Sequence, residues 1–270
     1  MSRTSLCAAL IGLAVACCND PAVTPGPALP PGPGVLTGTA AKQLDSQKEV
    51  AEAQVKEADV VARGLLSSCE ARVYDPRRDS FLDHAEGTIR VTTSAGEAVY
   101  RFVYDSTYPP ERPVRFETVS QPAGVGERTI ADVRNWANLA CIGAFPVVAY
   151  YRPPIPLQVV PSTDRKGIIV LAPAFRTDLS VSYSLDARQL IVARAEWSDA
   201  KHKYVTNYDW DPYGGGRNLL RRAIVFEGST TDFDYGDHEG VQLLDRVHVK
   251  DRDRPIEAVF TYTTLRRRAH

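Results

Sequence analysis

A long series of short alternating segments restricts this chain to a fold built mainly of β-strands. Residues 179–185 place Leu, Val, Tyr and Leu on one side and three serines on the other, and residues 97–104 alternate in the same way. This period of two is typical of antiparallel strands that bury one face and expose the other to water. Short turns rich in Asp, Gly and Ser favour hairpins between them. Eleven or twelve strands are expected, at residues 69–74, 88–93, 97–104, 113–119, 157–160, 168–171, 179–185, 190–197, 202–210, 219–227, 241–249 and 256–263.

Two segments carry a helical period instead. Residues 42–66 repeat apolar side chains at intervals of three, four and seven, with charged side chains on the other face. Residues 129–141 show a similar stripe, and Gly143 and Pro146 end that helix. The apolar positions are Leu44, Ala51, Val55, Ala58, Val61, Ala62 and Leu65 in the first helix, and Ile130, Val133, Trp136, Ala137 and Ala140 in the second.

Two helices are too few to cover a flat sheet of this many strands. A strongly curved antiparallel sheet that wraps around both amphipathic helices, a half-barrel, would bury the apolar faces of the strands with the helices available. The expected fold is therefore mainly β, in the α+β class. It would form a single domain over residues 42–265.

The order of these elements resembles the half-barrel of the periplasmic lipoprotein carriers and acceptors of the LolA, LolB and LppX type. The most similar stretch is residues 167–212, where a strand ends in a proline loop, the next contains an Asp turn, and two further strands carry tyrosines. The likeness covers about residues 42–263 and is one of pattern, because that superfamily has no catalytic motif to match. It implies a cavity between the sheet and the helices that holds acyl chains.

The candidate lining of such a cavity consists of apolar and aromatic side chains that alternate along the expected strands. Ordinary core packing is the alternative for each of them, and the sequence does not show which face of the sheet is concave. Tyrosine and tryptophan carry polar groups that need partners when buried, which favours a place at the mouth of a cavity. The candidates are Tyr100, Phe102, Phe116, Val181, Tyr183, Ile191, Trp197, Tyr204, Tyr208 and Trp210.

The first sixteen residues have the pattern of a signal peptide. Arg3 precedes eleven uncharged small or apolar residues, from Leu6 to Ala16. As a helix this run would rise about 16 Å, roughly half of a hydrocarbon core, so it is too short to remain as a membrane span. We expect residues 1–16 to be removed.

The residues that follow the apolar run resemble the lipobox of bacterial lipoproteins. Ala14, Val15 and Ala16 precede Cys17, which is the expected lipidation site. Ala14 departs from the Leu or Val usual three places before the cysteine. Cys18 is the competing acceptor, and an ordinary secretory signal with two incidental thiols is the remaining alternative.

A proline-rich tether, residues 17–41, is expected to join the lipidated cysteine to the domain. Such sequence is extended at about 3.1 Å per residue, so it could span roughly 70 Å. Neither candidate cysteine is followed by Asp, which in lipoproteins of enterobacterial type resembles an inner-membrane retention signal. By this analogy the protein belongs to the bacterial cell envelope, anchored to the outer rather than the inner membrane, with its domain in the periplasm.

Charge and motifs exclude several other classes of function. With 32 basic and 33 acidic side chains the chain has no basic excess for a nucleic acid. Residues 232–239 are acidic but lack the spacing of a calcium loop, and an acidic hairpin tip is the expected structure. Cys69 and His84 are present, but no nucleophile or zinc motif accompanies them. No catalytic residue, metal or cofactor is expected, and the chain is expected to be a monomer and not an enzyme.

Cys69 and Cys141 are the cysteines inside the expected domain. In an oxidising compartment they could form a disulfide, or remain two buried thiols; the sequence leaves both open. The function expected from the sequence is a lipid-anchored protein that binds an apolar ligand, either a lipid or the acyl chains of another lipoprotein. The alternative is an adaptor or sensor with a filled core that acts through its surface.

Overall fold

The computed structural model describes residues 38–109, 112–143, 155–162, 167–175, 180–199, 201–225, 228–251 and 254–269. Its helices are α1 (Gly38–Arg72), α2 (Pro76–Asp79) and α3 (Glu127–Ile142), with a 3-10 turn, η2, at Gly214–Gly216. The strands are β1 (Leu82–Thr93), β2 (Gly96–Asp105), β3 (Val114–Ser120), β4 (Leu157–Val160), β5 (Ile168–Pro173), β6 (Ser180–Asp186), β7 (Ile191–Ser198), β8 (Lys203–Tyr213), β9 (Arg217–Val225), β10 (Ser229–His238), β11 (Val241–Lys250) and β12 (Ile256–Arg267).

The strands form one curved, open sheet of twelve antiparallel strands, in the order β3-β2-β1-β12-β11-β10-β9-β8-β7-β6-β5-β4. The chain makes the hairpins β1 to β3, crosses by α3 to the opposite edge, and returns strand by strand until β12 pairs with β1. β3 and β4 are the two edges. The prediction of a mainly β, curved antiparallel sheet is confirmed.

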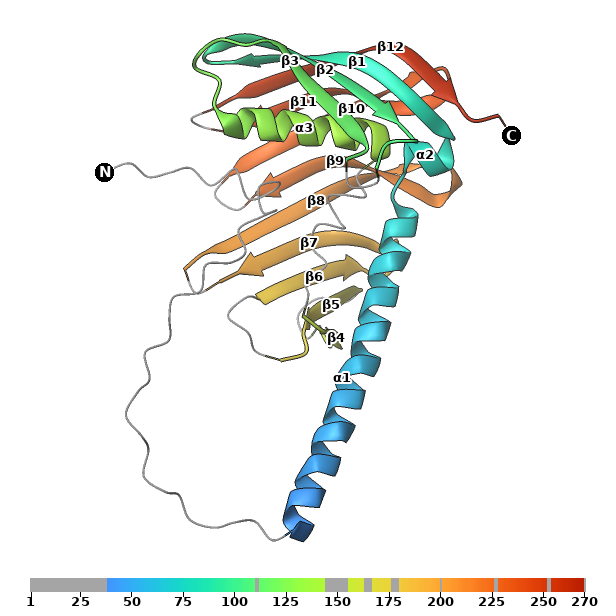
Figure 1. Cartoon of the computed structure of the whole chain (residues 1–270), viewed down its shortest axis with the longest axis vertical. Helices are drawn as coiled ribbons and strands as arrows, with labels where there is room; N and C mark the ends of the chain where they lie inside the picture. The colour runs from blue at the N-terminus through green and yellow to red at the C-terminus, as the bar shows by residue number, and fades with distance from the viewer. Residues whose placement is uncertain are drawn as a thin grey trace.

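The helices divide the sheet into two halves. α3 packs against β1, β3 and β11, whereas α1 meets β4, β7 and β9. Figure 1 shows α3 across the upper strands, and α1 running down beside β8 to β4 and on past the β4 edge. We call β1–β3 with β10–β12 the α3 half, and β4–β9 the α1 half. The face that carries both helices is called the inner face.

Burial follows the alternation of the sequence. Val181, Tyr183 and Leu185 of β6 are at most 3% exposed, and the serines between them are partly exposed. Tyr100 and Phe102 of β2 are fully buried in the same hydrophobic core. Gly87 lies between Phe102 on β2 and Tyr262 on β12 in the register of the sheet. A Cβ at this glycine would stand 2.3 Å from the carbonyl oxygen of Thr261, so only glycine fits.

The expected helix at residues 42–66 is longer than predicted, and its amphipathic character is not confirmed. α1 begins at Gly38, inside the segment assigned to the tether, and ends at Arg72. Ala62, Leu66 and Cys69 are buried, whereas Val61, which the prediction placed on the apolar face, is 53% exposed. Among the described residues no helix is both long and apolar enough to cross a membrane.

Two local predictions are wrong. Residues 69–74 are not a strand but the last turn of α1 and the link to α2, with one bridge from Val73 to Asn218. Residues 232–239 are not a hairpin tip, because β10 continues through them to His238. At the end of the chain β12 includes Arg267, and Arg266 and Arg268 both pair with Asp83.

Candidate functional site

Three of the ten predicted lining residues lie in the α3 half, two of them fully buried and Phe116 partly buried against the core. Tyr100 and Phe102 have no exposed surface, and Phe116 on β3 stacks on the ring of Tyr100 at 5.1 Å between centroids. Arg134 of α3 lies over Phe116, 5.5 Å from its centroid. The Tyr100 hydroxyl donates to Gln121 at 3.3 Å. These contacts make the three residues part of the packing of the fold.

Six of the other seven lie on the inner face of the α1 half. Val181 pairs with Trp197 and Trp197 with Tyr204, so these three form one row across β6, β7 and β8. Tyr183 lies in the next row, and Tyr208 and Trp210 lie further along β8. The indole of Trp210 donates to the carbonyl oxygen of Val192 at 2.8 Å.

Ile191 is on the other face. The register shifts between Ser184 and Leu185, so Val192 faces Leu185 and Ile191 faces Asp186. Because paired residues share a face, Ile191 points away from the row that contains Leu185. Ile191 is still only 5% exposed, but it is not part of the core cluster that includes both long helices.

The row of Val181, Trp197 and Tyr204 ends in aromatic side chains that are only partly buried. Trp197 and Tyr204 are both half-buried, with their rings 5.0 Å apart. The exposed imidazole of His202 stacks on Tyr204 at 5.9 Å. We call this the open end of the α1 half, where β7 ends and β8 begins. Phe175, 50% exposed, follows the end of β5 on the same side.

α1 is attached to the α1 half at two places, one beside the edge strand β4 and one at the end of the helix. Halfway along the helix, Asp59 accepts a hydrogen bond from the backbone N–H of Leu157 at 2.8 Å, and Arg63 donates to Asp59 at 2.7 Å. Burial tends to raise the pKa of Asp59, but these two hydrogen bonds outweigh it and lower the pKa. Leu157 begins the edge strand β4, so α1 protects part of that edge from pairing with another chain.

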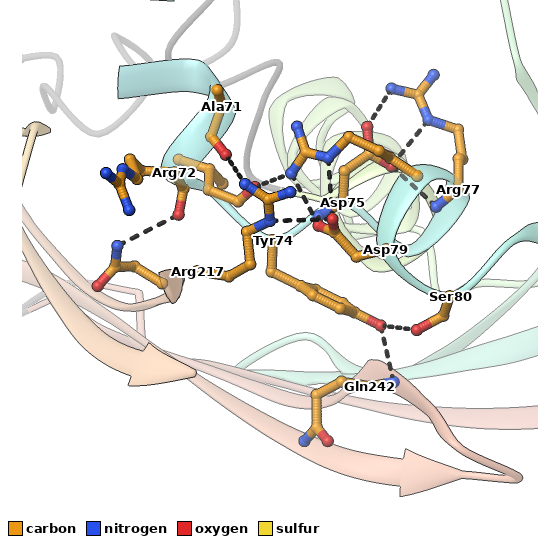
Figure 2. A network of polar contacts seen from close by, with 12 residues as sticks. Ala71, Arg72, Tyr74, Asp75, Arg77, Asp79, Ser80, Arg217 and Gln242 are labelled. Carbon is orange, nitrogen blue, oxygen red and sulfur yellow. Dashed lines mark hydrogen bonds and ion pairs between the residues drawn. The ribbon is translucent and has the colours of Figure 1, made fainter. Parts of the chain in front are cut away.

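The second attachment is a network of polar contacts where α1 turns into α2 (Figure 2). Arg217 at the start of β9 donates to the carbonyl oxygen of Ala71 and to Asp79, the latter at 3.0 Å. The hydroxyl of Tyr74 lies 2.8 Å from that of Ser80 and accepts from the backbone N–H of Gln242 at 3.0 Å. These bonds tie the end of α1 to β9 and β11.

A narrow space lies beside this network. Its lining includes Tyr74, Asn218, Tyr235 and Gln242, with Leu139 of α3, and it is too narrow to hold a water molecule. This space is therefore a small packing defect and not a ligand site.

The candidate nucleophile and its histidine do not meet. Cys69 and Cys141 are buried free thiols, so the possible disulfide is not formed. Burial, with a smaller effect of Glu70, raises the pKa of Cys69 to about 12, which keeps it a protonated and poor nucleophile. His84 has both ring nitrogens engaged, with Asp105 at 3.0 Å and Glu86 at 3.2 Å.

The acidic segment of β10 makes ion pairs with neighbouring strands. Asp232 pairs with Arg222 of β9 and, at 2.8 Å, with Lys250 of β11. His238 lies 2.6 Å from Asp245, the extra residue of a β-bulge in β11. Within the described ranges no group of three or more His, Cys, Asp or Glu side chains is arranged to hold a metal ion.

The predicted lipidation sites Cys17 and Cys18, with the signal peptide and most of the tether, lie outside the described residues. What the sequence reasoning missed is the group of basic residues at the open end. Lys201, His202 and Lys203 follow Trp197 closely in the chain. This combination of basic and aromatic side chains is the sequence pattern that could have predicted the group.

No protein-family model and no curated protein matches the chain. Solved structures that are similar to it include the following two. A DUF1329 family protein from Desulfovibrio piger is 11% identical, with 79% of this chain and 92% of that chain covered and a TM-score of 0.25. A protein domain from Vibrio parahaemolyticus, whose name refers to outer membrane lipoprotein sorting, is 9% identical, with 79% and 93% covered and a TM-score of 0.25. At these scores neither likeness supports an argument about function.

Proposed function

We propose that this chain is a membrane-anchored lipoprotein of the bacterial envelope, acylated at Cys17, that binds an apolar ligand on the inner face of its α1 half. The ligand would be a lipid or the acyl chains of another lipoprotein. The anchor rests on the sequence of residues 1–18. The assignment of the ligand surface rests on the fold.

The observation that carries the proposal is the half-buried Trp197–Tyr204 pair at the open end. The pair continues the row of Val181, which is 3% exposed, so apolar surface runs without interruption from the core to the open end. An alkyl chain laid along this row would gain about 0.8 kcal/mol for each methylene removed from water. The tyrosine and indole polar groups would remain at the rim, where water can reach them.

The alternative function, an adaptor or sensor with a filled core, has its own supporting observation. Leu171, Tyr183 and Leu185, in the middle of the α1 half, are at most 1% exposed. A ligand must therefore either stop at the open end or displace packed side chains. The adaptor would work through the surface of the sheet, with no ligand inside.

Uptake of a fluorescent fatty acid separates the two functions. The protein tested is the full mature chain with Cys17→Ser and Cys18→Ser, so that no acyl chain of its own competes. The proposal expects saturable uptake that Trp197→Ala reduces by about tenfold and Phe116→Ala, a matched aromatic change in the α3 half, leaves unchanged. If no variant takes up the probe, and native mass spectrometry of protein extracted without detergent shows no lipid, the adaptor function is the correct one.

A further inference from the structure

The open end of the α1 half carries basic side chains beside its aromatic ones. Lys201 and His202 lie in the turn between β7 and β8, and Lys203 begins β8. His202 stacks on Tyr204, and the side chain of Lys203 is 61% exposed. Phe175, at the end of β5, adds an apolar ring that is half exposed. We define the open-end surface as Phe175, Trp197, Lys201, His202, Lys203 and Tyr204.

The charges of this surface are not equally compensated. Lys203 pairs with Glu196 at 2.7 Å and His202 with Asp199 at 3.3 Å. The side chain of Lys201 has no ion pair with any described residue, although its backbone N–H donates to the carboxylate of Asp199 at 2.7 Å. Other charged side chains of the sheet, such as Arg246 and Glu257, are paired across strands. A lysine without an ion pair, close in the chain to partly exposed aromatic rings, is the combination that favours a lipid headgroup region.

The attachment at the end of α1 lies far from the β7–β8 turn, whereas the Asp59–Leu157 contact lies beside the end of β5 that leads to Phe175. Asn218, at the start of β9, donates to the carbonyl oxygen of Arg72 at 3.2 Å. This bond lies where β8 ends and β9 begins, and Lys203 lies at the other end of β8. β8 has 11 residues, so about 35 Å separate the two ends. The expected tether is long enough, at about 3.1 Å per residue, for either end of the domain to reach the bilayer.

We infer that the open-end surface docks on the headgroup region of a bilayer that contains anionic lipid, with Lys201 against the phosphates and Phe175 and Trp197 at the level of the interface. This inference rests on the proposed function, because it gives the inner face of the α1 half a direct route to its apolar ligand. It adds the entry point and the chemistry of the surface from which the ligand comes.

Co-sedimentation with vesicles tests the inference. The full mature chain with Cys17→Ser and Cys18→Ser is mixed with two kinds of vesicle. One contains phosphatidylcholine alone, and the other also contains about 30% phosphatidylglycerol, which gives the surface a negative charge. We expect binding only to the anionic vesicles, weakened about fivefold by Lys201→Glu and strongly reduced at 0.5 M salt, where the Debye length falls to about 4 Å. Phe175→Ser should weaken it by a similar factor.

The matched control is Arg188→Glu, in the β6–β7 turn at the opposite end of the same strands. It makes the same change of charge, and binding should be unaffected. Quenching of tryptophan fluorescence by brominated lipid is a second measurement. Trp197→Phe should abolish the quenching, although Trp136 and Trp210 still fluoresce. Circular dichroism and the urea midpoint show that Lys201→Glu, at an exposed position, is folded.

Equal binding by the parent, Lys201→Glu and Arg188→Glu, or no binding to either vesicle, overturns the inference. A change in oligomeric state caused by Phe175→Ser without vesicle binding would assign this surface to a second copy of the chain and also overturn it. Fatty acid uptake from solution is independent of vesicles, so protein that takes up the probe but does not dock disproves the docking alone. Failure of uptake with intact docking disproves the proposed function instead.

Discussion

The two halves of the sheet bury their inner faces with helices of different character. In the α3 half, α3 presents Trp136 and Val133, which are at most 4% exposed, to a sheet that carries Tyr100 and Phe102. In the α1 half, the buried apolar side chains of α1 are Ala62, Leu66 and Cys69, none of them aromatic. α3 thus inserts an aromatic ring into its half, whereas α1 inserts none and leaves the Trp197–Tyr204 row partly exposed. The difference places structural packing in one half and the proposed ligand surface in the other.

The strongest test of this difference compares two tryptophans. Trp136→Ala in α3 removes a buried indole from a closed core and should cost about 3–5 kcal/mol of unfolding free energy. Trp197→Ala in β7 removes a half-buried ring at the open end and should cost about 1–2 kcal/mol. Urea unfolding followed by circular dichroism measures both. If the two variants lose equal stability, the open end is packed as tightly as the α3 half.

The second prediction concerns a carboxyl group on α3. Burial raises the pKa of Asp132 to about 6, although Arg128 opposes the shift. Because the pKa of Asp132 is higher in the folded than in the unfolded state, its protonated carboxyl group contributes stability that is complete below about pH 4. This contribution is lost as the pH rises through about 6. Asp132→Asn should therefore be more stable than the parent at pH 7, by about 1–3 kcal/mol, and equal to it at pH 4. Urea midpoints at both pH values give the difference, and a variant less stable at pH 7 would contradict this sign.

Asp59 on α1 should behave in the opposite way and by a smaller amount. Its folded pKa is lowered, so its contribution is complete above the unfolded pKa and is lost as the pH falls through the folded value. Asp59→Asn weakens charged hydrogen bonds to Arg63 and to the N–H of Leu157, and should cost about 1 kcal/mol at pH 7. Hydrogen exchange at Leu157 should become faster while exchange in β1 is unchanged. Unaltered exchange at Leu157 would mean that α1 does not depend on this contact.

The strands were predictable because their signal is local. The alternation at residues 179–185 and 97–104 appears in the structure as β6 and β2 with the expected faces. Residues 69–74 misled for the same reason: Cys69, Ala71 and Val73 alternate with polar or larger side chains, as a strand would. The buried positions Ala62, Leu66, Cys69 and Val73 instead follow the helical period.

The remaining features depend on partners far away in the chain. The acidic residues of β10 look like a solvated tip until Arg222 and Lys250 are placed beside Asp232. Ile191 was assigned to the wrong face because a one-residue bulge reverses every side chain beyond it. Which half of the sheet each helix covers, and therefore which aromatic residues are core, depends on the pairing of β12 with β1, and no local pattern shows that pairing.

The smallest expected effect belongs to the outward face of α1. Val60 is 66% exposed on a helix whose buried positions lie two residues further, at Ala62, and four residues beyond that, at Leu66. Val60→Ser removes apolar surface that is already in water, so unfolding free energy should change by no more than about 0.5 kcal/mol. Ala62→Ser, at a position with no exposed surface, is the matched change and should cost more, because it buries a hydroxyl. If Val60→Ser lost more unfolding free energy than Ala62→Ser, α1 would pack on the sheet through the face that carries Val60. The face that carries Ala62 would then not cover the α1 half.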